Sequence, residues 1–372
     1  AASDVYKRQN IGGGVAKAGT VGAGAAVNFV QNTNQTIAQL GNSDTNGRLN
    51  LTFTENQSKN HILNVKAEEN NDNIQVAIGV GAAKGDKNNN SATQAAAGGS
   101  FNTDVLKNSV SAIIDNSTIK TEGADSIAVN VGAENHSTSY KGAGGMSLNI
   151  ASNSSTSVGG SIGGNLNLIN KTTTAAVKNS KIEDASSVNV AANAQKDKDG
   201  NLKPTEELVS VGVAGSVVTG GESAYNFQGA IGVDVINNIV SALIDESQVT
   251  SSGNVNVDAN NYVDNGNIAG SLGFAKSKGV GVGIGTVVDV ITSTVNANIT
   301  NSTVTSTNGL ISVDSDAKED LQFLAVNMGI TTDQTVATAN AIVNVLNNTV
   351  GASVTNLSLI HISEPTRHLR IS

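Results

Sequence analysis

The chain contains no cysteine and no tryptophan, only two prolines, and aromatic residues at 3% of its 372 positions. Without cysteine it forms no disulfides and carries out no thiolate chemistry. Aromatic rings normally fill much of the core of a protein of this length, because each ring buries a large area. Valine, isoleucine, leucine, alanine and glycine must therefore fill the interior, and we expect a thin core.

Positive charge is also scarce. The formal net charge is −9, and of the four arginines only Arg48 lies outside the two ends of the chain. Phosphate recognition needs clustered lysine and arginine, so we expect no nucleic-acid partner. Charged residues are only 14% of the chain, and its many β-branched residues argue against disorder. No apolar run reaches the ~18 residues that a membrane-spanning helix needs, so no transmembrane segment is predicted in this fragment.

The two ends differ from the rest of the chain. Residues 1–9, AASDVYKRQ, and residues 358–372, SLIHISEPTRHLRIS, resemble translated sequencing-adapter reads. Both segments are set aside from fold reasoning, as scars of that kind should be. We expect residues 10–357 to be a fragment of a longer protein, made of about six repeat units.

A repeated phrase organises this body: alanine, an aliphatic residue, Asn-Ser or Glu-Ser, then another aliphatic residue at alternating positions. Full copies begin at Ala112, Ala175, Ala242 and Ala297, and partial copies at Ala38 and Ala352, so the repeats are spaced 74, 63, 67, 55 and 55 residues apart. A second phrase of the VNVxA type follows each full copy, and a glycine-rich alternating phrase completes each unit. Period-two alternation predicts β-strands throughout, including residues 236–243, whose apolar spacing alone would also fit a helix.

Repeated short strands with one apolar face predict a stack in which equivalent strands of successive units pair. The sequence therefore predicts an all-β fold, a parallel β-helix (β-solenoid) of imperfect 55–74-residue units. With rungs of ~20 residues, each unit would supply about three rungs of a rod. Residues 44–60 and 195–207 are interpreted as insertions. The glycine-rich segment 208–219 is expected to form a hairpin with residues 228–237 that leans off the rod.

Motifs that carry chemistry are weak. Gly159–Gly163 matches the G-x-S-x-G nucleophile elbow, but the related AGSLG at 269–273 indicates that the pattern belongs to the repeat. Residues 197–201, DKDGN, have the spaced oxygens of a calcium loop but the wrong glycine position, and we interpret them as a solvated turn. His61 and His136 are predicted to be surface residues. We therefore predict no catalytic, cofactor-binding or metal-binding residues, and no enzymatic activity.

Together, the NSxI and VNVxA phrases and the VGVAGS-type strands resemble the passenger region of type V secreted proteins, the filamentous-haemagglutinin-like and leukotoxin-like autotransporter adhesins. The resemblance covers nearly all of residues 10–357. It implies a right-handed β-helix on the outer-membrane surface of a Gram-negative cell, or released from it. It also implies a receptor on host cells or other bacteria, and an outer-membrane translocator encoded outside this fragment.

Two alternatives to a structural and binding rod remain open. A cytolysin or leukotoxin-like segment is implied by the toxic members of the same family. A β-helix enzyme acting on polysaccharide would normally place arginine or lysine beside several carboxylates in a groove, and Arg48 is nearly alone among arginines.

Overall fold

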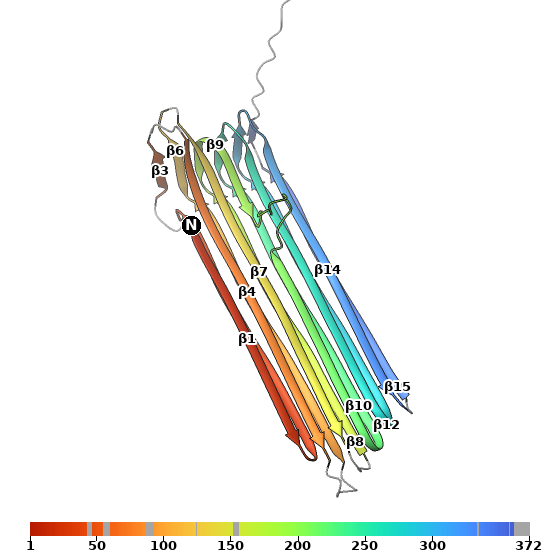
Figure 1. The fold of residues 1–372 in the computed structure, drawn as a ribbon. Coiled ribbons are helices and arrows are strands. Elements are labelled where there is room, and N and C mark those ends of the chain that lie inside the picture. The colour runs from red at the N-terminus through yellow and green to blue at the C-terminus, as the bar shows by residue number, and fades with distance from the viewer. Residues whose placement is uncertain are drawn as a thin grey trace, which may run out of the picture.

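The computed structural model describes residues 1–42, 47–54, 60–85, 93–123, 125–151, 156–332, 335–356 and 358–360. Within these ranges the chain is all-β, with sixteen strands and no helix (Figure 1). Most of the strands are long and run side by side along one direction, in three sets that the chain visits in turn. The expectation of an all-β protein is confirmed, including the strand over residues 236–243.

In each unit the chain runs out along one long strand, returns along a second and finishes with a short third strand. The outbound sheet contains β1 (Ala2–Ala18), β4 (Asn60–Lys84), β7 (Ser126–Ile150), the first halves of β10 (Glu206–Asp245) and β12 (Val255–Thr300), and β14 (Ile311–Thr331). The return sheet contains β2 (Val21–Leu40), β5 (Gln94–Asp115), β8 (Thr156–Lys178), the second halves of β10 and β12, and β15 (Thr335–Thr355). The short set contains β3 (Leu49–Phe53), β6 (Ser117–Thr121), the first part of β9 (Lys181–Ala192), β11 (Gln248–Ser251), β13 (Thr303–Ser306) and β16 (Ser358–Ile360). The second part of β9, Val188–Ala192, pairs with β7 and β12 and so belongs to the outbound sheet.

Every ladder between these strands is parallel and joins one unit to the next. The alanines that begin the repeated phrase pair in register, as Ala112↔Ala175 and Ala242↔Ala297 do. A whole unit is therefore one coil, and the expectation of about three ~20-residue rungs per unit is wrong. A rung of ~20 residues with three sides would need a turn about every 7 residues. The glycine-rich phrases instead continue as long strands beyond the short apolar phrases, such as the 25 residues of β4. Six coils at ~4.8 Å spacing make a stack only about 25–30 Å thick.

Two local expectations need correction. Residues 49–53, placed inside an insertion, form β3 and pair with β6, with Leu51 opposite Ile119. Leu51 and Phe53 pack on the apolar core, which explains why the segment is a strand. The neighbouring residues 43–46 and 55–59 of that segment lie outside the described residues. Residues 208–219 and 228–237 form no hairpin, because each pairs with the neighbouring coils and the two segments lie in opposite sheets.

The segment predicted as a second insertion does interrupt the coils. Residues 193–205 connect β9 to β10 outside the strands and contain an isolated antiparallel bridge between Lys196 and Leu202. Only the two ends of the segment bond to the outbound strands, where Asn193 N–H donates to the carbonyl oxygen of Ala133 and Thr205 N–H to that of Tyr262. At the beginning of the chain, β1 includes residues 2–9 and pairs with β4 from Ala2 onward. At the other end, Ser358–Ile360 form β16, and residues 361–372 lie outside the described residues.

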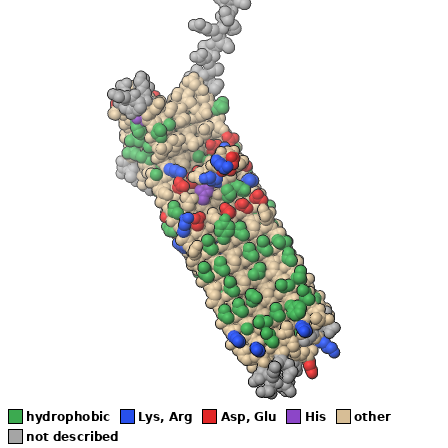
Figure 2. All heavy atoms as spheres, viewed as in Figure 1, with side chains coloured by type: hydrophobic (Ala, Val, Ile, Leu, Met, Phe, Trp, Pro, Cys, Tyr) green, Lys and Arg blue, Asp and Glu red, His purple; other side chains and the backbone are tan. Residues whose placement is uncertain are grey.

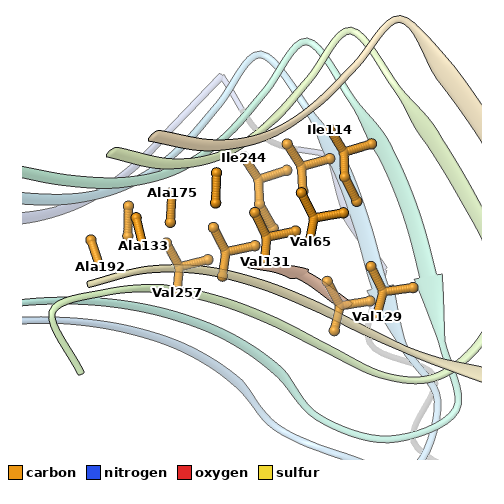
Figure 3. Packing of buried hydrophobic residues seen from close by; sticks show 14 of the residues in the cluster. Val65, Ile114, Val129, Val131, Ala133, Ala175, Ala192, Ile244 and Val257 are labelled. Carbon is orange, nitrogen blue, oxygen red and sulfur yellow. The ribbon is translucent and has the colours of Figure 1, made fainter. Parts of the chain in front are cut away.

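One end of each coil, which we call the base, is three-sided and has an apolar core. The base is formed by the short strands, the start of the outbound strands and the end of the return strands, and its valines, isoleucines and alanines point toward one another (Figure 3). Ile114 of the return strand β5, Ile119 of the short strand β6 and Val131 of the outbound strand β7 come from the three sides and are completely buried. The NSxI and VNVxA phrases therefore encode this core, since their alternating aliphatic residues all face inward.

The Asn-Ser pairs form the corners of the base. Asn116, Asn179, Glu246 and Asn301 have positive φ between 44° and 49°, the left-handed conformation that asparagine tolerates best among residues with a side chain. The serine that follows links the coils: the backbone N–H of Ser180 donates to Ser247 Oγ at 3.1 Å, and Ser247 N–H donates to Ser302 Oγ at 3.0 Å. The repeat thus specifies both a turn and its attachment to the next coil.

Candidate functional site: the two surfaces of the long arm

Beyond the base, the outbound and return sheets continue as a flat two-layer region, which we call the arm. Its inward and outward residues have the reverse of the usual composition. Along β12, Ile268 and Leu272 point outward and are 36% and 52% exposed, whereas the neighbouring Asn267 and Ser271 point inward and are buried. Alternation places every second residue on the same face. The arm therefore has apolar outer faces and an interior rich in polar residues and glycine, in which aliphatic side chains form only small clusters such as that of Leu106, Ile169, Leu208, Ile236, Val263 and Ile291.

The apolar outer surface extends over the whole arm. Figure 2 shows hydrophobic side chains spread over one face of the arm, between a band of charged side chains nearer the base and lysines at the tip. An exposed apolar area that spans many strands exceeds what a monomeric soluble protein normally leaves uncovered, and usually marks an interaction surface. Exposed members on the outbound sheet include Ile74, Ile78, Met146, Leu148, Val213, Val217, Ile268, Leu272, Leu324, Val326 and Met328.

A shallow groove of about 490 Å³ crosses the return sheet on its outer face. One ladder of its floor runs Ala23, Ala97, Gly160, Phe227 and Val282 in consecutive coils. The groove exists because small residues, alanine and glycine, occupy this ladder in the early coils. The larger side chains of Phe227 in the same ladder and of Ile162 and Ile284 in the adjacent ladder form its walls. It is an apolar depression in the outer face, and it runs along the stack.

Inside the arm, glycine allows the two sheets to approach closely. A Cβ atom added to Gly79 would lie 1.8 Å from the carbonyl oxygen of Gly99 on the opposite sheet, and one added to Gly163 would lie 2.1 Å from that of Val213. No side chain fits at such positions. The glycine-rich phrases thus serve close backbone packing.

Nearer the base, the interior of the arm holds charged residues in pairs. Lys141 Nζ lies 2.7 Å from Asp104 Oδ2 and also donates to Asn167 Oδ1. Lys171 donates to Ser137 Oγ at 2.9 Å and lies 3.4 Å from Glu206 Oε2. Burial lowers the pKa of both lysines and raises the pKa of Glu206, and in each case the ion-pair partner opposes the shift. Charges removed from water need partners of this kind, because an unpaired one is costly.

A pair of carboxyl groups lies in later coils, at the same distance from the base as Asp104. Asp234 and Asp289 are adjacent in the return sheet, and both are at most 1% exposed. Burial raises the pKa of Asp234. Burial, and then the charge and contact of Asp234, raise the pKa of Asp289 to about 8. Two buried carboxylates this close cannot both ionise without a compensating positive charge.

Sequence reasoning missed this buried ladder, although a signal for it exists. Asp104, Asn167, Asp234 and Asp289 each precede the anchor alanine of their unit by eight residues, which places them on the inward face. They also stack in register. Recognising them required knowing that the arm interior is polar, which reverses the ordinary reading of an alternating strand.

The motifs weighed in the sequence have structural positions. Gly159–Gly163 lies in the middle of strand β8, where Ser161 is buried, so the strand–turn–helix of a nucleophile elbow is not formed there. Asp197 Oδ1 accepts the backbone N–H groups of Asp199 and Asn201 at 2.8 and 2.9 Å, and these bonds lower the pKa of Asp197. That geometry is the turn expected for this segment. Arg48 donates to the carbonyl oxygen of Asn179 at 3.0 Å and so contacts a corner of the base.

The two histidines are less exposed than predicted. His61 Nε2 lies 3.0 Å from Asp125 Oδ2 and the His61 side chain is 10% exposed. His136 is 15% exposed, with Nε2 3.3 Å from Glu134 Oε2 and Nδ1 3.0 Å from the carbonyl oxygen of Pro204. The prediction of surface histidines is therefore wrong, because neighbouring coils and the 193–205 connection supply polar partners that half-bury them.

Adjacent carboxylates behave as the strand alternation predicts. Glu206 points inward and is buried, whereas Glu207 points outward and accepts from the Tyr140 hydroxyl at 2.5 Å. Among the described residues, no group of three or more His, Cys, Asp and Glu side chains is placed to hold a metal ion. The described part of the chain also has no helix long and apolar enough to cross a membrane.

Comparison with known proteins finds no matching family model, no matching curated protein and no matching solved structure.

Proposed function

We propose that residues 10–357 form a right-handed β-solenoid that is part of the passenger of a secreted adhesin similar to the filamentous-haemagglutinin-like and leukotoxin-like autotransporters. It is exposed on the outer surface of a Gram-negative cell and attaches that cell to host cells or to other bacteria. The register supports the solenoid, because each unit pairs with the next over nearly its whole length. A translocator outside this fragment would export it.

The observation that carries the binding role is the apolar outer surface of the arm. Aliphatic and aromatic side chains that could have filled the interior are displayed outward instead, and the groove across the return sheet concentrates several of them. Exposed apolar side chains contribute binding free energy when a partner buries them. The Lys141–Asp104 and Lys171–Glu206 pairs and the Asp234–Asp289 pair are enclosed between the sheets, where a bulky polysaccharide has no access.

Attachment of cells to surfaces coated with the purified chain tests this proposal. We expect epithelial cells, leukocytes or unrelated bacteria to attach above an albumin-coated control. The double variant Phe227→Ser/Ile284→Ser, which makes the groove polar, should reduce attachment at least several-fold at equal coating density. Leu310→Ser is the matched control, because Leu310 is 73% exposed but lies in a turn at the base.

No attachment by any of these cells to the wild-type chain would rule out the adhesive role. Equal attachment to the groove variant and to wild type would show that the cells bind a part of the surface outside the groove.

A cytolysin-like role is the second candidate, and the ends of the arm favour it. Lys17, Lys84, Lys276 and Lys278 occur at the strand ends farthest from the base, beyond the apolar surface. Lysine beside exposed aliphatic side chains suits contact with anionic lipid headgroups. Dye release from leukocytes, but not from receptor-free vesicles, would favour this role over plain adhesion. Leukocytes that bind the protein and keep their dye would favour adhesion.

A further inference from the structure

In the ladder of Asp104, Asn167, Asp234 and Asp289, a lysine neutralises the first carboxylate. Asp104, on the return sheet, faces Lys141 of the outbound sheet, and Lys141 Nζ contacts both Asp104 and the amide oxygen of Asn167 in the next coil. One positive charge thus lies between the sheets and is held by oxygen atoms from two successive coils. In the outbound sheet, the residues in register after Lys141 are Ser210 and then Asn267.

The following two coils keep the carboxylates and lose the lysine. Asp234 Oδ2 accepts from Asn267 Nδ2 at 3.0 Å, and Asp289 Oδ1 accepts from the same nitrogen at 3.3 Å. Asn265 Nδ2 also donates to Asp289 Oδ1, at 3.1 Å. One amide group therefore bridges two carboxylates, although it supplies no charge to balance them.

The polar atoms around this pair are incompletely used. Asp289 Oδ2 and the side-chain oxygens of Asn265 and Asn267 accept from no N–H or hydroxyl donor of the protein, although all three residues are at most 1% exposed, and the Asp289 carboxyl group instead contacts the carboxyl group of Asp234. Such buried atoms require an explanation. Rotating either amide by 180° exchanges its nitrogen and oxygen at no steric cost, and points the oxygen at the carboxylates. That orientation is favourable only with a cation among these oxygens.

From this geometry we propose that Asp234, Asp289, Asn265 and Asn267 bind a calcium ion between the two sheets, in the place that the lysine ammonium takes two coils earlier. The ligand set consists of oxygen atoms alone, two carboxylates and two amides, which is the chemistry that Ca²⁺ prefers. Water completes the usual six to eight ligands. The alternative is a proton shared by the two carboxyl groups, which the elevated pKa of Asp289 makes possible without a metal.

A bound calcium ion would link successive coils of the arm through a charge that the hydrogen bonds there do not supply. It joins the sheets where Asp234 and Asp289 belong to successive coils, so calcium would hold the later coils together as Lys141 holds the earlier ones. Extracellular calcium would then stabilise the arm. This inference is independent of whether the apolar surface binds cells or lipid.

Calcium binding to the full chain, stripped with EDTA and dialysed, tests the proposal directly. Isothermal titration with CaCl₂ at pH 8.5 should show about one equivalent bound, and the melting temperature should rise with calcium by the mass-action relation. Asp289→Asn should weaken binding at least tenfold. Asp104→Asn is the matched control, because it removes a buried carboxylate that already has its lysine, and it should leave calcium binding within about twofold of wild type.

Asn267→Lys provides the second, independent variant. It places an ammonium group at the register position that follows Lys141 by two coils, and it should abolish calcium binding while leaving the arm folded without the metal. Absence of calcium binding by the wild-type chain at millimolar calcium would show a shared proton instead, and would overturn the proposal. Binding that persists unchanged in both Asp289→Asn and Asn267→Lys would also overturn it.

Discussion

The base and the arm are built from the same strands but held together by different forces. In the base, three sides close around aliphatic residues, and Ile114, Ile244 and Ile299 are completely buried (Figure 3). In the arm, two sheets meet through glycine, asparagine, paired charges and a few small aliphatic clusters, and many of the large aliphatic residues lie outside. The hydrophobic effect thus stabilises the base. Backbone ladders, close packing and buried polar pairs stabilise the arm, which leaves its apolar surface free for binding.

The largest expected effect comes from breaking a buried charge pair in the arm. Lys171→Met leaves Glu206 buried without its cation, and we expect the free energy of unfolding at pH 8 to fall by about 3–5 kcal/mol. The loss should be smaller at pH 5, because the raised pKa of Glu206 allows the carboxyl group to become neutral. Urea denaturation at the two pH values measures both effects.

The uncharged double variant Lys171→Met/Glu206→Gln is the control for that experiment. It should regain much of the lost stability at pH 8, since neither charge remains. A loss below about 1 kcal/mol in the single variant would mean that water reaches this part of the interior.

A cavity in the base should have the next largest effect. Ile244→Ala removes a fully buried side chain from the core, and we expect a loss of about 2–5 kcal/mol. Ile239→Ala, five residues earlier on the outer face of the same return strand, is the matched variant, because Ile239 is 41% exposed. It should change the stability by no more than about 0.5 kcal/mol. Similar losses for the two isoleucines in guanidinium unfolding would contradict the assignment of an apolar core to the inner face of the base.

Close packing of the arm predicts a smaller effect at glycine. A Cβ at Gly145 would lie 2.1 Å from the carbonyl oxygen of Ile162, so Gly145→Ala must push the sheets apart, at a cost of about 1–3 kcal/mol. Gly142, in the same strand, has open space around its Cβ position. Gly142→Ala should be neutral or slightly stabilising, because alanine restricts the unfolded chain. Thermal unfolding of the two variants gives this difference, and equal melting temperatures would contradict it.

The smallest expected effect is a pH dependence of opposite sign at two neighbouring residues. Burial raises the pKa of Glu69, which accepts from Asn34 Nδ2 at 2.9 Å, whereas the Lys66 side chain lowers the pKa of the outward Glu68. The protonated form of Glu69 is favoured by folding. Its contribution to stability is therefore complete below pH ~4.5 and is lost as the pH rises through the raised pKa, by at most ~1.4 kcal/mol per pH unit.

Glu68 contributes in the other direction. Its stabilisation is present above pH ~4.5 and is lost as the pH falls through the lowered pKa. Glu69→Gln should flatten the decline of unfolding free energy between pH 4.5 and neutrality, and Glu68→Gln should slightly flatten the decline at lower pH. Unfolding free energies measured from pH 3 to 8 test both signs, and identical profiles for the two variants would refute the assignment of inward and outward faces.

Much of this arrangement was predictable from particular residues. The anchor alanines at 112, 175, 242 and 297 give the register of the stack, and Asn116, Asn179 and Asn301 give its corners. The reason is that identical residues in successive units favour pairing with one another, and asparagine accepts the left-handed turn. The expectations about the fold that proved wrong concerned β3, the rung size and the hairpin. Each depended on where the chain turns back, which alternation of residues does not encode.

The sequence by itself determined that the protein is all-β, that its units pair in parallel and that the aliphatic phrases form a core. These follow from residue period and repetition, which act locally. Only the tertiary structure decided that each unit is one long coil and that the arm turns its polar residues inward. An alternating strand has two faces, and which of them is buried depends on what the opposite sheet presents. In the arm the opposite sheet presents glycine, asparagine and lysine, so Asp104, Asp234 and Asp289 are enclosed while Ile268 and Leu272 remain outside.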